Sequence, residues 1–221
     1  MLSKEEILEV KQEYIDLLKE IKRPDCDIDG FIAYLESTDF FSAPASTQYH
    51  CSFPGGLCLH SINVYKALKL LTDKFASKID NNTKEIVPTY KKDSILIVGL
   101  LHDLDKILKY EKTCKNEKEY CDDGDKSDSI GTFRWKTTET YKVKDPTTKV
   151  NLGNKGFASY MIASMFFSLT EEEVYALTYQ YSAVSNEQLT DLSTILARYN
   201  LGVYLHSADI ITTYCVEKNN E

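Results

Sequence analysis

The most hydrophobic stretch of the chain, residues 95–110, contains the adjacent pair His102 and Asp103. Its apolar residues recur at helical spacing, at Ile97, Leu100, Leu101, Leu104 and Leu108. This spacing predicts a helix with one buried face and places the pair in the core. A lone carboxylate is costly in an apolar interior, so Asp103 is expected to have a partner. Two interpretations remain at this point: a hydrogen bond between the two side chains, or a shared metal ion.

Length, charge and cysteine spacing limit the classes of protein that fit. The 221 residues, 43% of them hydrophobic, suffice for one core, so residues 1–221 are expected to form a single domain. The net charge of -8 argues against a nucleic-acid polymer as partner. No signal segment or apolar run of membrane-spanning length is present, so no membrane partner is expected. Six cysteines without Cys-x-x-Cys spacing predict free thiols and a cytoplasmic location.

Local signals predict several further helices. Ser3 with Glu6, and Thr170 with Glu173, have the spacing of capping boxes, in which side chains satisfy the first backbone N–H groups of a helix. A first amphipathic helix is expected to end before Pro24. The other expected helices cover residues 31–36, 57–75, 156–167, 170–181, 191–199 and 201–214.

Residues 111–150 differ in character from the rest of the chain. They are rich in Lys, Asp, Glu and Thr and contain few large apolar side chains. Residues 132–136 and 140–143 show the alternation of exposed strands, and residues 110–114 are a suitable partner for one of them. We expect a polar β-hairpin insertion that is more exposed than the helical body.

Two distant residues add ligand chemistry to the pair. His60 follows a pair of glycines near the start of a predicted helix. Asp209 has apolar neighbours in the last predicted helix, where a carboxylate again requires a partner. An isolated histidine is usually structural. Considered with His102 and Asp103, however, His60 becomes a further candidate ligand from a second helix.

The motifs Gly-Gly-Leu-x-x-His60, Leu-Leu-His102-Asp103-x-x-Lys106 and His206-x-x-Asp209 occur in this order along the chain. They resemble the signature of the HD-domain metal-dependent phosphohydrolase superfamily. The chain is most similar to small, often phage-borne HD hydrolases. In these a Thr-Asp-Phe-Phe-x-Ala-Pro-Ala-Ser-Thr loop precedes Tyr-His and Gly-Gly-Leu, as it does within residues 38–60 here. The resemblance covers most of the chain.

The resemblance implies an all-α fold, an HD-domain helical bundle with a β-hairpin excursion. It implies a divalent metal ion (Mn, Fe, Co, Ni or Mg) bound by His60, His102, Asp103 and Asp209. Asp103 and Lys106 are the expected catalytic residues, with Asp103 or the nearby Asp105 orienting the attacking water. Lys106 and His50 are expected to bind the substrate, a small phosphate-containing molecule such as a nucleotide. The spacing of His102, Asp103 and Lys106 allows all three to share one helix face.

Two segments depart from the family pattern. Relatives usually carry Gly-His-Gly-Glu-Lys-Ser and Trp-His-Met-like segments, whereas Asn154 and Gln180 stand in place of both histidines here. Because the chain has only four histidines, a histidine-rich two-metal site cannot be built. Two functions therefore remain. One is a one-metal phosphohydrolase acting on a nucleotide or related small phosphate ester. The other is a catalytically degenerate HD-fold module that binds a nucleotide or a protein partner.

Overall fold

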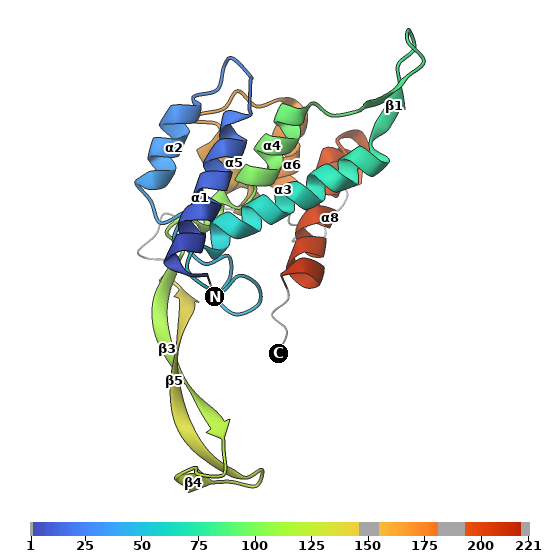
Figure 1. Cartoon of the computed structure of the whole chain (residues 1–221). Helices are drawn as coiled ribbons and strands as arrows, with labels where there is room; N and C mark the ends of the chain where they lie inside the picture. The colour runs from blue at the N-terminus through green and yellow to red at the C-terminus, as the bar shows by residue number, and fades with distance from the viewer. Residues whose placement is uncertain (1, 146–154, 181–192, 218–221) are drawn as a thin grey trace.

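Two helices, α3 (Gly56–Phe75) and α4 (Lys92–Leu101), pack against each other at the centre of the protein (Figure 1). The computed structural model describes residues 2–145, 155–180 and 193–217. All residues of α4 from 95 to 101 are buried. Gly99 allows the close approach of the two helices, because a Cβ at this position would lie 2.8 Å from Cα of Tyr65. The most hydrophobic stretch of the sequence is therefore the central element of the fold.

Further helices of the described residues lie around this pair: α1 (Lys4–Lys19), α2 (Ile28–Glu36), α5 (Lys155–Ala163), α6 (Glu171–Tyr179) and α8 (Leu201–Ile211). Both predicted capping boxes are confirmed, at the starts of α1 and α6. The helix expected over residues 156–167 ends earlier, at Ala163. Of the helix expected over residues 191–199, residues 193–198 are helical, and 191 and 192 lie outside the described residues.

The helix expected over residues 95–110 is shorter than its apolar pattern indicates. α4 ends at Leu101, and a 3₁₀ turn follows over Leu104–Lys106. Leu108 has a positive φ of 56° and is 48% exposed, so the prediction of a buried Leu108 was wrong. Its backbone N–H donates to Asp39 Oδ1 at 2.7 Å, which holds the chain as it turns into the next strand. The His-Asp pair consequently lies at a helix end.

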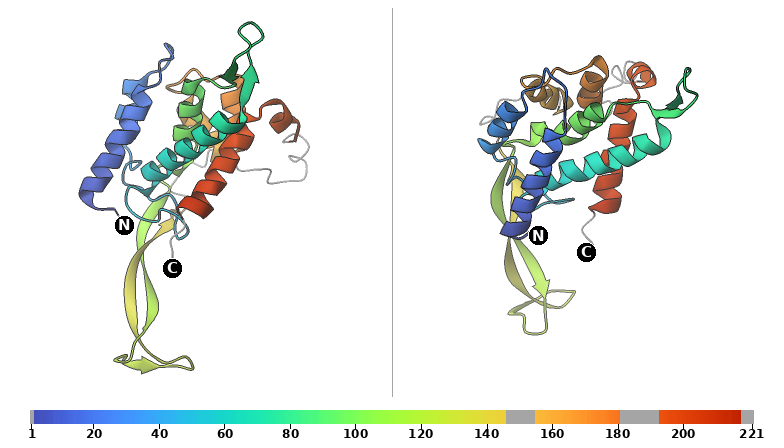
Figure 2. Two further views of the ribbon diagram at one scale, coloured as in Figure 1. Left: turned by 45° about the vertical axis from the view of Figure 1, so that its right-hand side comes forward. Right: turned by 45° about the horizontal axis from the view of Figure 1, so that its top comes forward.

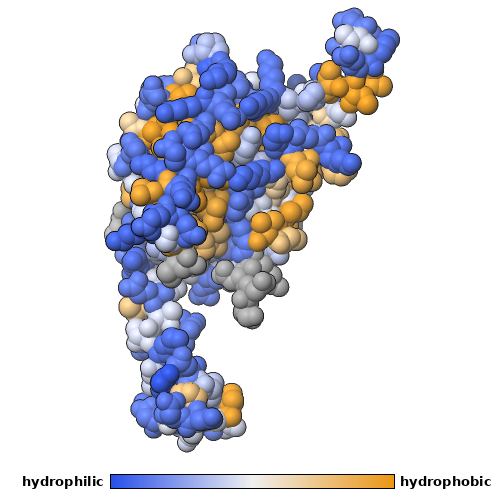
Figure 3. All heavy atoms as spheres, viewed as in Figure 1, coloured by the Kyte–Doolittle hydropathy of each residue, from blue (hydrophilic) through white to orange (hydrophobic). Residues whose placement is uncertain are grey.

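A long β-hairpin, called the arm here (residues 110–143), projects from the helical body in every view (Figures 1 and 2). Strand β3 (Tyr110–Tyr120) pairs antiparallel with β5 (Thr132–Val143), and the short β4 (Lys126–Ser127) pairs with the other edge of β5. Most side chains of β3 and β5 are exposed, as predicted. The surface of the arm is largely hydrophilic, and hydrophobic residues are visible at its far end (Figure 3). Ile130, which precedes β5, is exposed.

The strands change the fold class from the one expected. A second hairpin, β1 (Ser77–Ile79) with β2 (Ile86–Pro88), lies between α3 and α4. The described residues thus form two- and three-stranded antiparallel sheets besides the helices. The all-α assignment was wrong, and the fold is mixed α and β. The assignment failed because both hairpins form by pairing of neighbouring strands outside the helical core. No described helix has the length and apolar character needed to cross a membrane.

Candidate metal centre

Three elements bring the expected ligands to one place. His60 lies in the second turn of α3, His102 and Asp103 follow the last residue of α4, and Asp209 lies near the end of α8. Because α3 packs against both α4 and α8, the three segments meet. One ligand atom each from His60, His102 and Asp209 lies within 4.8 Å of the others.

Asp103 completes this cluster. Its Oδ2 lies 3.4 Å from Nε2 of His60 and 3.4 Å from Nε2 of His102. On the other side, Nε2 of His60 lies 3.2 Å from Oδ1 of Asp209. The side chains of His60, His102 and Asp103 are buried, whereas that of Asp209 is 22% exposed. The cluster is thus an internal set of two imidazoles and two carboxylates, and Asp209 is its most exposed member.

The orientation of His102 leaves one nitrogen for a ligand. Its Nδ1 lies 2.8 Å from the carbonyl oxygen of Gly99, which can only accept a hydrogen bond, so Nδ1 carries the proton. Nε2 of His102 has no hydrogen-bond partner among the described residues. The lone pair of this nitrogen faces Oδ2 of Asp103 at 3.4 Å, and the ammonium of Lys106 lies 2.5 Å from the same oxygen. A divalent metal ion beside the two acceptors would stabilise this contact further, and the mixed nitrogen and oxygen donors fit Mn, Fe, Co, Ni or Mg.

His60 is held by carboxylates at both nitrogens, and one of these carboxylates was missed by the sequence reasoning. Nδ1 of His60 lies 2.8 Å from Oε2 of Glu217, beside the contact of Nε2 with Asp209. Burial lowers the pKa of His60, but the hydrogen bonds to Asp209 and Glu217 outweigh it and raise the pKa to about 9. Glu217 follows the π-helical turn Thr212–Val216 after α8. Nothing in its local sequence distinguishes it from a surface glutamate.

Lys106 and His50 border the cluster. Nζ of Lys106 lies 2.5 Å from Oδ2 of Asp103, and its side chain is 12% exposed. The 3₁₀ turn, rather than an α-helical face, brings these two residues together. The ring of His50 lies 4.7 Å from that of His60, and neither of its nitrogens has a hydrogen-bond partner among the described residues. Burial, followed by the charges of His60 and Lys106, lowers the pKa of His50 to about 4, so its ring is neutral at pH 7.

Two other expected residues contact different partners. Asp105 pairs with Nζ of Lys109 at 2.9 Å, and its backbone N–H donates to Oγ of Ser159 on α5. Gln180 donates from Nε2 to the carbonyl oxygen of His102 at 2.5 Å. Asn154 lies outside the described residues. Gln180 therefore supports the main chain at the centre and adds no ligand to it.

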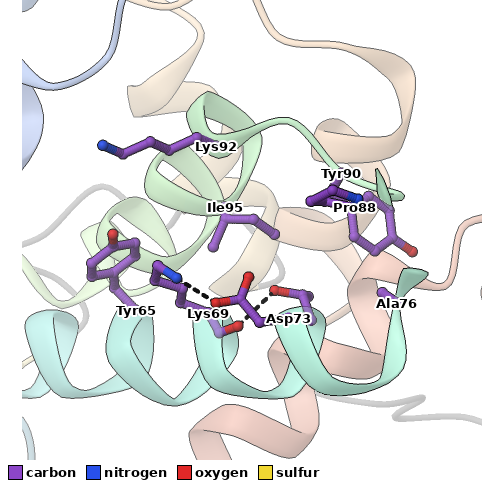
Figure 4. A pocket seen from close by; sticks show the side chains of 9 residues that line it. Tyr65, Lys69, Asp73, Ala76, Pro88, Tyr90, Lys92 and Ile95 are labelled. Atoms are coloured by element: carbon purple, nitrogen blue, oxygen red, sulfur yellow. Dashed lines mark hydrogen bonds and ion pairs between the residues drawn. The ribbon is translucent and has the colours of Figure 1, made fainter. Parts of the chain in front are cut away.

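A separate crevice lies along the C-terminal half of α3. It has a volume of about 170 Å³ and is lined by Tyr65, Tyr90 and residues near them (Figure 4). Its charged residues pair with each other or with neighbouring helices, as Lys69 does with Asp73. Asp73 lies about 20 Å further along α3 than His60. This crevice is therefore distinct from the cluster of imidazoles and carboxylates.

Comparison of the chain with protein-family models, with curated proteins and with solved structures gives no match. The resemblance to HD-domain phosphohydrolases consequently stays a prediction from the motifs in the sequence.

Proposed function

We propose that this protein is a one-metal phosphohydrolase that acts on a nucleotide or a related small phosphate ester. The observation that carries the proposal is the convergence of His60, His102, Asp103 and Asp209 on one buried cluster with Lys106 at its edge. These residues come from positions that are up to about 150 residues apart. A purely structural role would need neither two histidines nor a lysine beside the same carboxylate.

The four ligand candidates fit a divalent ion such as Mn, Fe, Co, Ni or Mg. They would hold it through Nε2 of both imidazoles and one oxygen of each carboxylate. Such an ion, when bound, lowers the pKa of a water ligand and neutralises charge that develops on a phosphoryl group. The remaining chemistry belongs to the side chains around it.

Lys106 and His50 are suited to bind the phosphate ester. Burial lowers the pKa of Lys106, but the negative charge of Asp103 outweighs it and raises the pKa, so the ammonium group stays charged. Because this group also contacts Asp103, a phosphate oxygen bound to Lys106 lies next to the ligand set. The ring of His50 is neutral at pH 7 and its nitrogens have no hydrogen-bond partner among the described residues, so its N–H can donate to a phosphate oxygen.

A second candidate function is a non-catalytic module that binds a nucleotide or a protein. Gln180 favours it, because an amide that supports the carbonyl oxygen of His102 replaces the histidine found in relatives. The two candidates differ in turnover. The module would bind its ligand in the same place but would release no phosphate.

The test is elemental analysis of the purified protein, followed by a phosphate-release screen over nucleotides with Mn, Co, Ni and Mg. We expect one bound ion, metal-dependent turnover, and loss of that turnover in His102→Ala. Lys106→Ala should keep the ion and slow turnover by about 10²- to 10³-fold. Lys66→Ala, which removes an exposed lysine paired with Glu13, is the matched control and should change neither. Nucleotide binding without turnover would favour the module, and absence of a bound ion would refute the metal centre.

A further inference from the structure

Both oxygens of the Glu217 carboxylate are bound inside the protein. Oε2 lies 2.8 Å from Nδ1 of His60, and Oε1 accepts a hydrogen bond from Nδ2 of Asn63 at 2.8 Å. The side chain is only 4% exposed. Burying a carboxylate is costly unless its oxygens are paired, so these two bonds hold Glu217 in one orientation.

One helix end delivers two of the three carboxylates that face His60, the third being Asp103. Asp209 lies on α8, which continues into the π-helical turn Thr212–Val216 and then Glu217. The backbone N–H of Glu217 donates to the carbonyl oxygen of Thr212 at 2.9 Å, which closes this turn. Asp209 thus contacts Nε2 of the imidazole, and Glu217 contacts Nδ1. The ring of His60 is fixed from two sides by a single segment.

We propose that Glu217 is a positioning residue of the metal centre, which keeps Nδ1 of His60 protonated and turns Nε2 toward the ion. This inference rests on the proposed function and extends it to a residue that contacts neither ion nor substrate. A carboxylate that accepts from the distal nitrogen of a histidine ligand fixes its tautomer and ring orientation and raises its basicity. Asn63, on α3 one turn after His60, anchors the carboxylate in this role.

A different role for the same residue is a second cation site, because one ligand atom each from His50, His60 and Glu217 lies within 4.8 Å of the others. That role requires His60 to bind ions through both nitrogens and to lose its last proton. It also requires Glu217 to give up the hydrogen bond that it accepts from His60. The observed geometry favours the hydrogen bond, and metal stoichiometry distinguishes the two roles.

The first measurement is metal affinity by Mn and Co titration in competition with a chelator. Glu217→Ala should weaken binding by about 10- to 100-fold while the stoichiometry stays at one. Glu217→Gln keeps a carbonyl acceptor for Nδ1 and should recover part of this loss. Glu36→Gln removes an exposed carboxylate that pairs with Lys11 and serves as the control with unchanged affinity. Thermal unfolding of each variant checks its fold, and Asn63→Ala provides a milder loss if Glu217→Ala does not fold.

The second measurement is the proton NMR spectrum of the Co-loaded protein. The Nδ1 proton of His60 should give an exchangeable, paramagnetically shifted signal that persists in the native chain and exchanges faster in Glu217→Ala. Unchanged affinity together with unchanged exchange would overturn the inference and leave the proposed function intact. Two bound ions in the native chain, with one lost in Glu217→Ala, would show that Glu217 is itself a ligand. A native chain that binds no metal would refute the proposed function and this inference together.

Discussion

The carboxylates around His60, chiefly Asp209 and Glu217, make the stability of the metal-free protein depend on pH. Burial lowers the pKa of His60, yet Asp209 and Glu217 together raise it from 6.5 to about 9, so folding favours the protonated ring. A group whose folded pKa is raised stabilises the fold fully below its unfolded pKa. The contribution is then lost as pH rises through the folded pKa. Stability should therefore fall between pH 6.5 and about 9.

The size of this effect follows from the two pKa values. Each pH unit between them corresponds to about 1.4 kcal/mol, so the full contribution to the free energy of unfolding is about 3 kcal/mol. About 2 kcal/mol of it is lost between pH 6.5 and pH 8.5. The carboxyl groups of Asp103, Asp209 and Glu217 have lowered pKa values and titrate below this window. Burial raises the pKa of the Cys51 and Cys58 thiols, which adds a loss only toward its upper end.

The assay is urea unfolding in the presence of a chelator at steps from pH 6 to pH 8.5. His60→Gln removes the titrating ring, so the difference between native and variant stability should shrink by about 2 kcal/mol across the window. A difference that stays constant with pH, or one that grows, would show that the carboxylates do not hold a proton on His60.

Three other experiments test the packing around the site and the exposure of the arm. Gly99→Ala inserts a Cβ 2.8 Å from Cα of Tyr65 and should destabilise the fold by about 1–3 kcal/mol in chemical denaturation. Gly131→Ala, whose nearest neighbour would be 3.9 Å away, is its control, and equal stability of the two variants would contradict the packing argument. Gln180→Ala leaves the buried carbonyl oxygen of His102 without this donor and should cost about 1–3 kcal/mol, visible as a lower Tm. Limited proteolysis should first cut residues 121–131 at the exposed end of the arm, and a first cut within α3 or α4 would refute this expectation.

Local signals in the sequence were enough to predict much of the fold. The capping boxes and the amphipathic spacing of α3 depend on residues within one or two turns. The pairing of β3 with β5 follows from alternation along each strand. The end of α4 was not predictable in this way. Its apolar spacing continues to Leu108, but a carboxylate on the distant Asp39 binds the backbone there and turns the chain.

The same distinction applies to the candidate site. Histidines and aspartates within apolar stretches can be recognised in a sequence as candidate site residues, because each requires a partner once it is buried. His60, His102 and Asp209 were identified for this reason, and the structure brings them together. Glu217 has no such surroundings, and only the π-helical turn and the long-range contact with His60 reveal it. Asp105 was expected near the attacking water. In the structure, however, its backbone N–H donates to Ser159 on α5 and its carboxylate pairs with Lys109.

The arm begins and ends at adjacent points of the body, since the backbone N–H of Lys144 donates to the carbonyl oxygen of Lys109 at 2.9 Å. A two-residue turn can join neighbouring antiparallel strands, so most of the arm can be excised without stretching the chain. At the far end, Phe133 is buried, and its ring contacts the rings of Tyr120 and Trp135, which also belong to the arm. The arm is therefore a separable insertion. A body closed by a short turn between residues 109 and 144 keeps every residue of the candidate site, so that site can be studied without the arm.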